Sequence, residues 1–206
     1  MCLPSTASAP GTGLDRPDES GTPVAARPTA RQSRCLQVVP LDPSTYRRHA
    51  LHGEERVWGE TNCYTDLVIE LAHGLGFEPL AMLAFTLAID FEGDQWTFFK
   101  PPACDLADLY GVELNELSVW RPLVEHVAEQ VEAGRPVLVE LDSWFLPDTA
   151  ATSYRAEHVK TTIIPEAIDR DAQVLRYFHN AGLYELRDAD YRGLFRIDPP
   201  AGLIDD

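Results

Sequence analysis

The sequence lacks the features that mark several common classes of protein. Its 206 residues contain no apolar run of 18 residues, and the N-terminal segment lacks the apolar core of a signal peptide. The four cysteines form no Cys-x-x-Cys pair, so we expect free thiols in a reducing compartment. Together, these absences predict a cytoplasmic protein that does not associate with membranes. No G-x-x-x-x-G-K-[ST], G-x-G-x-x-G or G-x-S-x-G pattern is present, which argues against nucleotide, dinucleotide and serine-hydrolase sites.

Positive charge is also scarce. The chain has 17 Lys and Arg residues against 33 Asp and Glu, a formal net charge of −16. A surface this acidic repels phosphate backbones, so we expect no nucleic-acid partner. The same surface suits a substrate that carries an amine.

The composition divides the chain into a folded part and two tails. Residues 1–34 are rich in Pro, Gly, Ser, Thr and Ala and contain few large apolar side chains, which predicts a disordered N-terminal tail. The 45% hydrophobic content of the whole chain is that of a globular protein, and we predict one domain over residues 35–198. Residues 199–206 form a predicted C-terminal tail.

Helical patterns precede strand patterns along the chain. The helix beginning at Cys63 is expected to end at Gly74 or Gly76, and the segment 79–89 is apolar on nearly every side, which predicts a buried helix. Further helices are predicted at 105–110, 122–133 and 188–195, and strands at 35–39, 95–100, 137–142, 158–164, 173–180 and 183–186. This order indicates an α+β fold, with N-terminal helices followed by an antiparallel sheet.

Cys63 is the candidate nucleophile. Thr61 and Asn62 are good N-cap residues, so the cysteine should lie in the first helical turn, where the helix dipole favours a thiolate. The alternative is that Cys63 is a small core residue, because Leu67 and Leu71 follow it on one helix face.

His158 is the candidate base, because it opens one strand of a predicted hairpin. Pairing around a turn near residue 170 would bring it close to Asn180, at the end of the next strand. His179 is the neighbouring choice, but side chains alternate between faces along a strand, so only one of the two can orient the imidazole. Asn180 is favoured because its amide oxygen accepts a hydrogen bond at any pH.

Several motifs together carry a resemblance to known families. They are Thr61-Asn62-Cys63-Tyr64, the segment 91–100, Asp142-x-x-x-Leu146-Pro147, the segment 157–162 and the segment 177–182. Over about residues 36–196 they resemble a bacterial family catalogued as a domain of unknown function and typically encoded beside amino acid:carrier-protein ligases. The order of the motifs also resembles the papain-like fold, in particular the N-terminal domain of butirosin biosynthesis protein H and, more distantly, bacteriocin-processing cysteine peptidases. Members of the bacterial family extend past the position at which this chain ends.

The resemblance implies an acyltransferase. Cys63 matches the nucleophile and His158 the base, whereas the third member falls at His179 or Asn180 rather than at an Asp. The Gln that the peptidases place six residues before the cysteine is replaced by Val57. The oxyanion would then be bound by the backbone N–H of the cysteine together with Asn62.

Other residues have two interpretations each. Asp142 is either a strand-end residue that bonds loop amides or, through its motif, a positioning residue of the site. Gln95 and Trp96, with His179, are candidates for a substrate pocket, although an aromatic strand more often belongs to the core. His49-x-x-His52 has metal-ligand residue types at a generic spacing, and we expect solvated surface histidines and no metal site.

These inferences predict a transfer of an aminoacyl or acyl group from a carrier-protein thioester to a small amine through a Cys63 acyl-enzyme. No bound cofactor is expected, and the phosphopantetheine arm of an aminoacyl carrier protein would carry the substrate. One alternative is a thioesterase or cysteine peptidase that uses the same residues. Another is a module that binds the carrier protein without catalysis.

Overall fold

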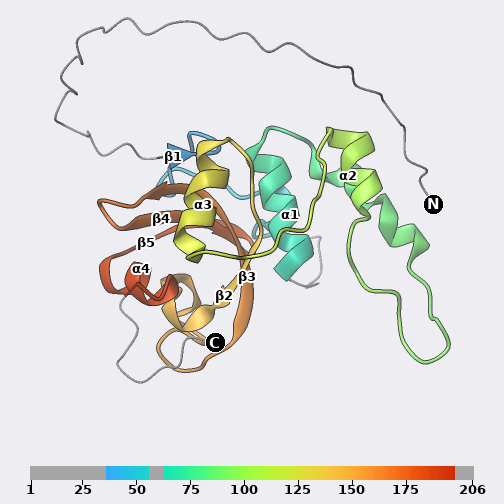
Figure 1. Cartoon of the computed structure of the whole chain (residues 1–206). Helices are drawn as coiled ribbons and strands as arrows, with labels where there is room; N and C mark the ends of the chain where they lie inside the picture. Colours follow the sequence, from blue (N-terminus) through green and yellow to red (C-terminus); the bar gives the residue numbers. More distant parts are fainter. Residues whose placement is uncertain (1–35, 56–62, 198–206) are drawn as a thin grey trace, which may run out of the picture. The chain divides into compact units, whose positions relative to one another are not determined.

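The computed structural model describes residues 36–55 and 63–197, so the predicted tails and Asn62 lie outside the described residues. The predicted order of helices followed by strands is confirmed, and the architecture is α+β (Figure 1). The elements are β1 Leu36–Gln37, η1 Ala50–His52, α1 Cys63–Gly74, η2 Pro79–Ala88, α2 Ala103–Tyr110, α3 Leu123–Glu132, β2 Val139–Asp142, η3 Ser143–Phe145, η4 Pro147–Thr149, β3 Lys160–Asp169, β4 Val174–His179, β5 Gly182–Arg187 and α4 Asp188–Leu194, where η denotes a 3₁₀ helix. No helix within these ranges is long and apolar enough to cross a membrane.

The long strand β3 organises the sheet. The strands follow the order β1-β3-β4-β5 with antiparallel pairing throughout, and β2 also pairs with β3. Strand β1 pairs near the end of β3, with Leu36 opposite Ile168, whereas β2 pairs at its start, with Asp142 opposite Lys160. The two short strands therefore occupy opposite ends of β3.

Each face of the sheet packs against a different set of helices, as side-chain alternation along the strands requires. One face packs against α3 and α4 in a core that includes Ile163, Leu175 and Tyr191. The other face packs against α1, where Leu67 and Leu71 contact the strand residues of a second cluster. The outer side of α1 is covered in turn by η1, η2 and α2 through Val68 and Ile69.

Helix α1 is buried on most of its sides, and its C-terminal residue shows how closely it packs. A Cβ at Gly74 would lie 2.9 Å from Cζ of Phe178 and 3.3 Å from Cδ1 of Leu41. A glycine at this position therefore allows the last turn of the helix to approach the sheet.

Two sequence-based predictions are wrong. The segment at 79–88 is a 3₁₀ helix in which only Pro79, Met82 and Phe85 are buried, whereas Leu87 is 91% exposed. The buried residues are three positions apart because a 3₁₀ helix has three residues per turn, so every third side chain lies on the same narrow face, which here faces the core. Residues 95–100 form no strand: Trp96 makes a single bridge with Phe91 across the turn at 92–95, and residues 97–100 have no regular secondary structure.

Candidate active site

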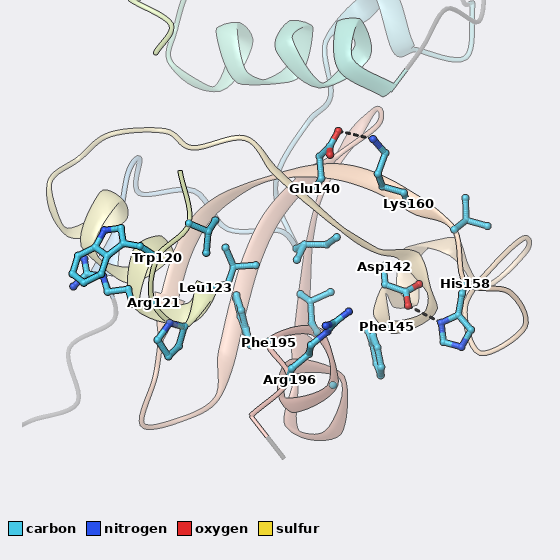
Figure 2. A pocket seen from close by; sticks show the side chains of 16 residues that line it. Trp120, Arg121, Leu123, Glu140, Asp142, Phe145, His158, Lys160, Phe195 and Arg196 are labelled. Atoms are coloured by element: carbon cyan, nitrogen blue, oxygen red, sulfur yellow. Dashed lines mark hydrogen bonds and ion pairs between the residues drawn. The ribbon is translucent and has the colours of Figure 1, made fainter. Parts of the chain in front are cut away.

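His158 and Asp142 form a hydrogen-bonded pair at the start of β3. Nδ1 of His158 lies 2.6 Å from Oδ2 of Asp142, while Oδ1 of Asp142 accepts the backbone N–H of Trp144 at 3.0 Å (Figure 2). The indole of Trp144 stacks on the imidazole, with centroids 4.5 Å apart and an interplanar angle of 6°. The imidazole is thus oriented by a carboxylate and an aromatic plane, and Nε2 is the nitrogen available for proton exchange.

The pair is accessible to solvent. The side chain of His158 is 68% exposed and that of Asp142 is 36% exposed. The backbone holds the two residues in place, because Asp142 is the last residue of β2 and the N–H of Ser143 donates to the carbonyl of Val159 at 2.9 Å. An exposed but oriented imidazole can transfer protons to and from a bound substrate.

Asn180 does not have the expected position. It lies in the turn between β4 and β5 with a positive φ of 47°, and it is exposed. Because Ile164 pairs with Phe178, Asn180 falls level with Thr162 in the same register. His158 is four residues further along, about 13 Å away at the rise of a strand. The orienting role predicted for Asn180 is therefore filled by Asp142.

His179 belongs to a buried network. Its Nδ1 lies 2.5 Å from Oδ2 of Asp148 and its Nε2 lies 2.8 Å from Oγ1 of Thr161. The other Asp148 oxygen accepts the hydroxyl of Tyr177 at 2.5 Å. With both ring nitrogens occupied and 2% of its surface exposed, His179 connects β3, β4 and η4 and does not face a substrate.

Cys63 is the first residue of α1, as predicted, and is half buried. The described residues that line the cleft containing His158 do not include Cys63. Gln95 and Trp96 are also outside this cleft, and both are exposed in the turn that the bridge to Phe91 closes.

The direction of α1 relates Cys63 to the His158–Asp142 pair. At its C-terminal end, Gly74 approaches Leu41, a residue of the segment that follows β1. Strand β1 pairs with the far end of β3, so the C-terminal end of α1 lies towards that end. The helix therefore runs roughly parallel to β3, with its N-terminal end towards the start of β3.

The helix is long enough to bring Cys63 level with that start. The 11 residues from Gly74 to Cys63 rise about 16 Å in a helix, and the four from Ile164 to Lys160 rise about 13 Å in a strand. The cleft that contains Asp142 and His158 is lined by Phe145, Leu194 and Phe195, which belong to the core on the α3 and α4 side of the sheet. Cys63 and Asp142 thus lie towards the same end of the sheet.

A cleft of about 1130 Å³ extends from His158 across the sheet end. Its walls come from β2, η3, the start of β3, the end of α4 and the segment before α3 (Figure 2). Lys160 and Arg121, two of its cations, have carboxylate partners in Glu140 at 2.8 Å and in Glu129. The cleft combines paired charges with the aromatic rings of Trp120, Phe145 and Phe195, which is typical of sites for small organic molecules.

The histidines at 49 and 52 form part of a buried ionic cluster, so the prediction of solvated surface histidines is wrong. His52 is 2% exposed, and its ring nitrogens lie 2.5 Å from Glu70 and 3.3 Å from Asp66. Burial lowers the pKa of His52, but the hydrogen bonds and charges of Asp66 and Glu70 outweigh it and raise the pKa to about 9. His49 donates its backbone N–H to Glu70. Within residues 36–55 and 63–197, no three His, Cys, Asp or Glu side chains are grouped to hold a metal ion.

Trp144, which stacks on His158, is a residue of this site that the sequence does not single out. The signal for it was indirect, since the Asp142-x-x-x-Leu146-Pro147 motif encloses it. A carboxylate at a strand end that caps the following 3₁₀ turn is a common structural arrangement, and nothing in the local pattern indicates a histidine 16 residues later.

Comparison with known proteins identifies a family. Residues 47–203, which are more than half of the chain, match the family described as the DUF1839 N-terminal domain. No curated protein and no solved structure matches the chain significantly.

Proposed function

The chain belongs to the DUF1839 N-terminal domain family, and from this premise we propose that it is a cysteine-dependent acyltransferase of papain-like type. Cys63 is the proposed nucleophile, His158 the base and Asp142 the residue that orients the base. The substrate is an aminoacyl or acyl thioester on a carrier protein, and the acceptor is a small amine. A location in the cytoplasm is part of the same proposal.

The observation that carries the proposal is the exposed His158–Asp142 pair. Outside an active site, an oriented, solvent-accessible imidazole with a carboxylate on Nδ1 and an aromatic plane behind it brings little stability, because exposed ion pairs contribute at most about 1 kcal/mol. Such a pair is suited to accept a thiol proton at Nε2. Cys63, at the N-terminus of α1, where the helix dipole favours a thiolate, is the thiol that we propose supplies it.

The proposed chemistry has two steps. Nε2 of His158 takes the proton of the Cys63 thiol, and the thiolate attacks the thioester carbonyl. The carbon–sulfur bond to the carrier breaks, the carrier thiol leaves with the proton from His158, and an acyl-Cys63 thioester remains. An amine then attacks this thioester while His158 accepts the amine proton, which it returns to the Cys63 thiolate as the amide is released.

The test is intact-mass analysis of the protein after mixing with a carrier protein charged with an aminoacyl group. The wild type should gain the mass of the acyl group, with the adduct mapped to Cys63, and adding the amine should discharge it as an amide. Cys104, an exposed cysteine on α2, provides the matched control, because Cys104→Ala should still form the adduct and Cys63→Ala should not. Wild-type transfer by Cys63→Ala would refute the mechanism. Release of free acid that the amine does not divert would indicate a thioesterase or peptidase.

A module that binds a carrier protein without catalysis is the second candidate, because Cys63 is not among the described residues that line the cleft containing His158. In that case the charged carrier would bind without forming any adduct. Iodoacetamide would then label Cys63 no faster than unfolding exposes it.

A further inference from the structure

Arg196 is the cleft cation whose charge no described residue neutralises. The other positively charged or protonatable groups of the cleft have carboxylate partners: His158 has Asp142, and Lys160 and Arg121 are each paired with a glutamate. Within the described part of the chain, Arg196 has no ion pair, although the sequence is strongly acidic as a whole.

The backbone of Arg196 supports a role for its side chain. It occupies the position after the C-cap of α4 with a φ of 50°, where glycine is the usual residue. Its N–H donates to the carbonyl of Gly193 at 3.2 Å, and the N–H of Ile197 donates to that of Arg192 at 3.0 Å, which together form a Schellman motif. A glycine would satisfy this motif with less strain, so the arginine brings no benefit to the backbone.

The cleft between Arg196 and His158 has an apolar floor. Figure 2 shows the ring of Phe145 between Arg196 on one side and the Asp142–His158 pair on the other. The floor is fixed by close packing, because a Cβ at Gly193 would clash with the ring carbons of Phe145. A hydrocarbon chain could lie on this ring with one end at each polar group.

We propose that this cleft binds a substrate portion that ends in a carboxylate, with Arg196 as the residue that selects it. The carboxylate accepts hydrogen bonds from the guanidinium, the hydrocarbon part lies on Phe145, and the reacting group is held beside His158. The identity of the reacting group beside His158 rests on the proposed acyl transfer, whereas the carboxylate site at Arg196 does not. The carboxylate belongs either to the acyl group or to the amine acceptor, and the two sources are separated experimentally.

The kinetic test compares matched pairs of compounds that differ only in the charged group. Glutaryl-pantetheine and its neutral amide analogue serve as acyl donors, and β-alanine and β-alaninamide serve as acceptors. The wild type should prefer the anionic member of one pair by about tenfold or more, and Arg196→Gln should lose that preference without losing the reaction of the neutral compounds. The pair that shows the preference identifies the source of the carboxylate. Equal preference in wild type and Arg196→Gln would overturn the assignment and leave the acyl transfer intact.

A binding measurement keeps the test independent of catalysis. Calorimetric titration with glutarate and with its monoamide, and with the β-alanine pair, needs no reaction at Cys63. A preference for the anion in the wild type that disappears in Arg196→Gln supports the carboxylate site even if no thioester reacts. Indifference to charge in both pairs refutes it.

Arg196→Gly separates ligand binding from a structural role. Glycine relieves the left-handed backbone, so the thermal midpoint should rise by about 2–4 °C while the preference for the anion is lost. If the arginine instead served only to stabilise the C-terminal end of α4, the glycine variant would be less stable and would keep its selectivity. Arg187→Gln, which removes an exposed arginine paired with Glu185 outside the cleft, should change neither property.

Discussion

Glu166 offers the sharpest test of the described electrostatics, because its carboxyl group is buried without a hydrogen bond. It is the extra residue of a bulge between Pro165 and Ala167 in β3 and is 1% exposed. Neither carboxyl oxygen has a hydrogen-bond partner among the described residues. Burial raises the pKa of Glu166 from 4.5 to about 7, although nearby backbone N–H groups and Arg176 lower it in part.

A raised carboxyl pKa means that the folded state binds the proton more tightly than the unfolded state. The ionisation of Glu166 therefore costs nothing below pH 4.5, where the carboxyl is protonated in both states, and it destabilises the fold progressively as the pH rises from 4.5 to 7. A difference of about 2.5 pKa units corresponds to about 3 kcal/mol above pH 7. Glu166→Gln, which imitates the protonated acid, should remove this cost.

The assay is urea unfolding of the wild type and Glu166→Gln between pH 4.5 and pH 8. The free energy of unfolding of the variant should exceed that of the wild type by less than about 1 kcal/mol at pH 4.5 and by about 3 kcal/mol at pH 8. Glu132→Gln on α3, where the glutamate is exposed, is the control and should show no such trend. A difference between wild type and Glu166→Gln that does not change with pH would refute the reasoning.

Three further predictions concern the ionic cluster, the candidate site and the packing of α1. Since the pKa of His52 is raised from 6.5 to about 9, the stabilisation of the fold by protonated His52 is complete below pH 6.5 and is lost as the pH rises through 9. In urea unfolding, His52→Gln should therefore show a free energy of unfolding that depends less on pH over this range. The same pH dependence in the variant and the wild type would contradict the raised pKa. Asp142→Asn should lower the rate of acyl-enzyme formation about 100-fold or more without changing the thermal midpoint by more than a few degrees, because His158 loses its orientation; a rate within threefold of wild type would exclude that role. Gly74→Ala should lower the free energy of unfolding by about 1–2 kcal/mol in urea titrations, because its Cβ would lie 2.9 Å from the ring of Phe178, and equal stability would show that the ring moves aside.

Periodicity was sufficient to predict most of the fold. The helix at Cys63, the amphipathic helix before Gly134 and the strands after residue 137 all appear within a few residues of their predicted bounds. In each case a hydrophobic pattern and a terminating glycine or turn indicate the same element. The error at η2 arose because an entirely apolar segment has no periodicity, so that a 3₁₀ and an α-helix cannot be distinguished from it.

The candidate site depended on pairing register, which local patterns do not determine. The sequence correctly indicated a hairpin that turns near residue 170, but Asp169 pairs with Val174, so the turn is centred between 171 and 172 and Asn180 ends four positions away from His158. The partner of β3 near His158 is instead β2, which approaches from the other side of the strand. Local patterns relate only segments that follow each other in the sequence, whereas β3 pairs with both β1 and β2 in addition to β4.

The shared edge explains how an exposed imidazole can be oriented. Strand β2 ends at Asp142, opposite Lys160, so His158 lies just beyond the last ladder position and its ring is free of the packing that encloses His179. Orientation then comes from two contacts on the same short segment of β2 and η3, the carboxylate of Asp142 and the indole of Trp144. Both contacts leave Nε2 open, so a proton can pass between this nitrogen and a group that approaches from outside the sheet.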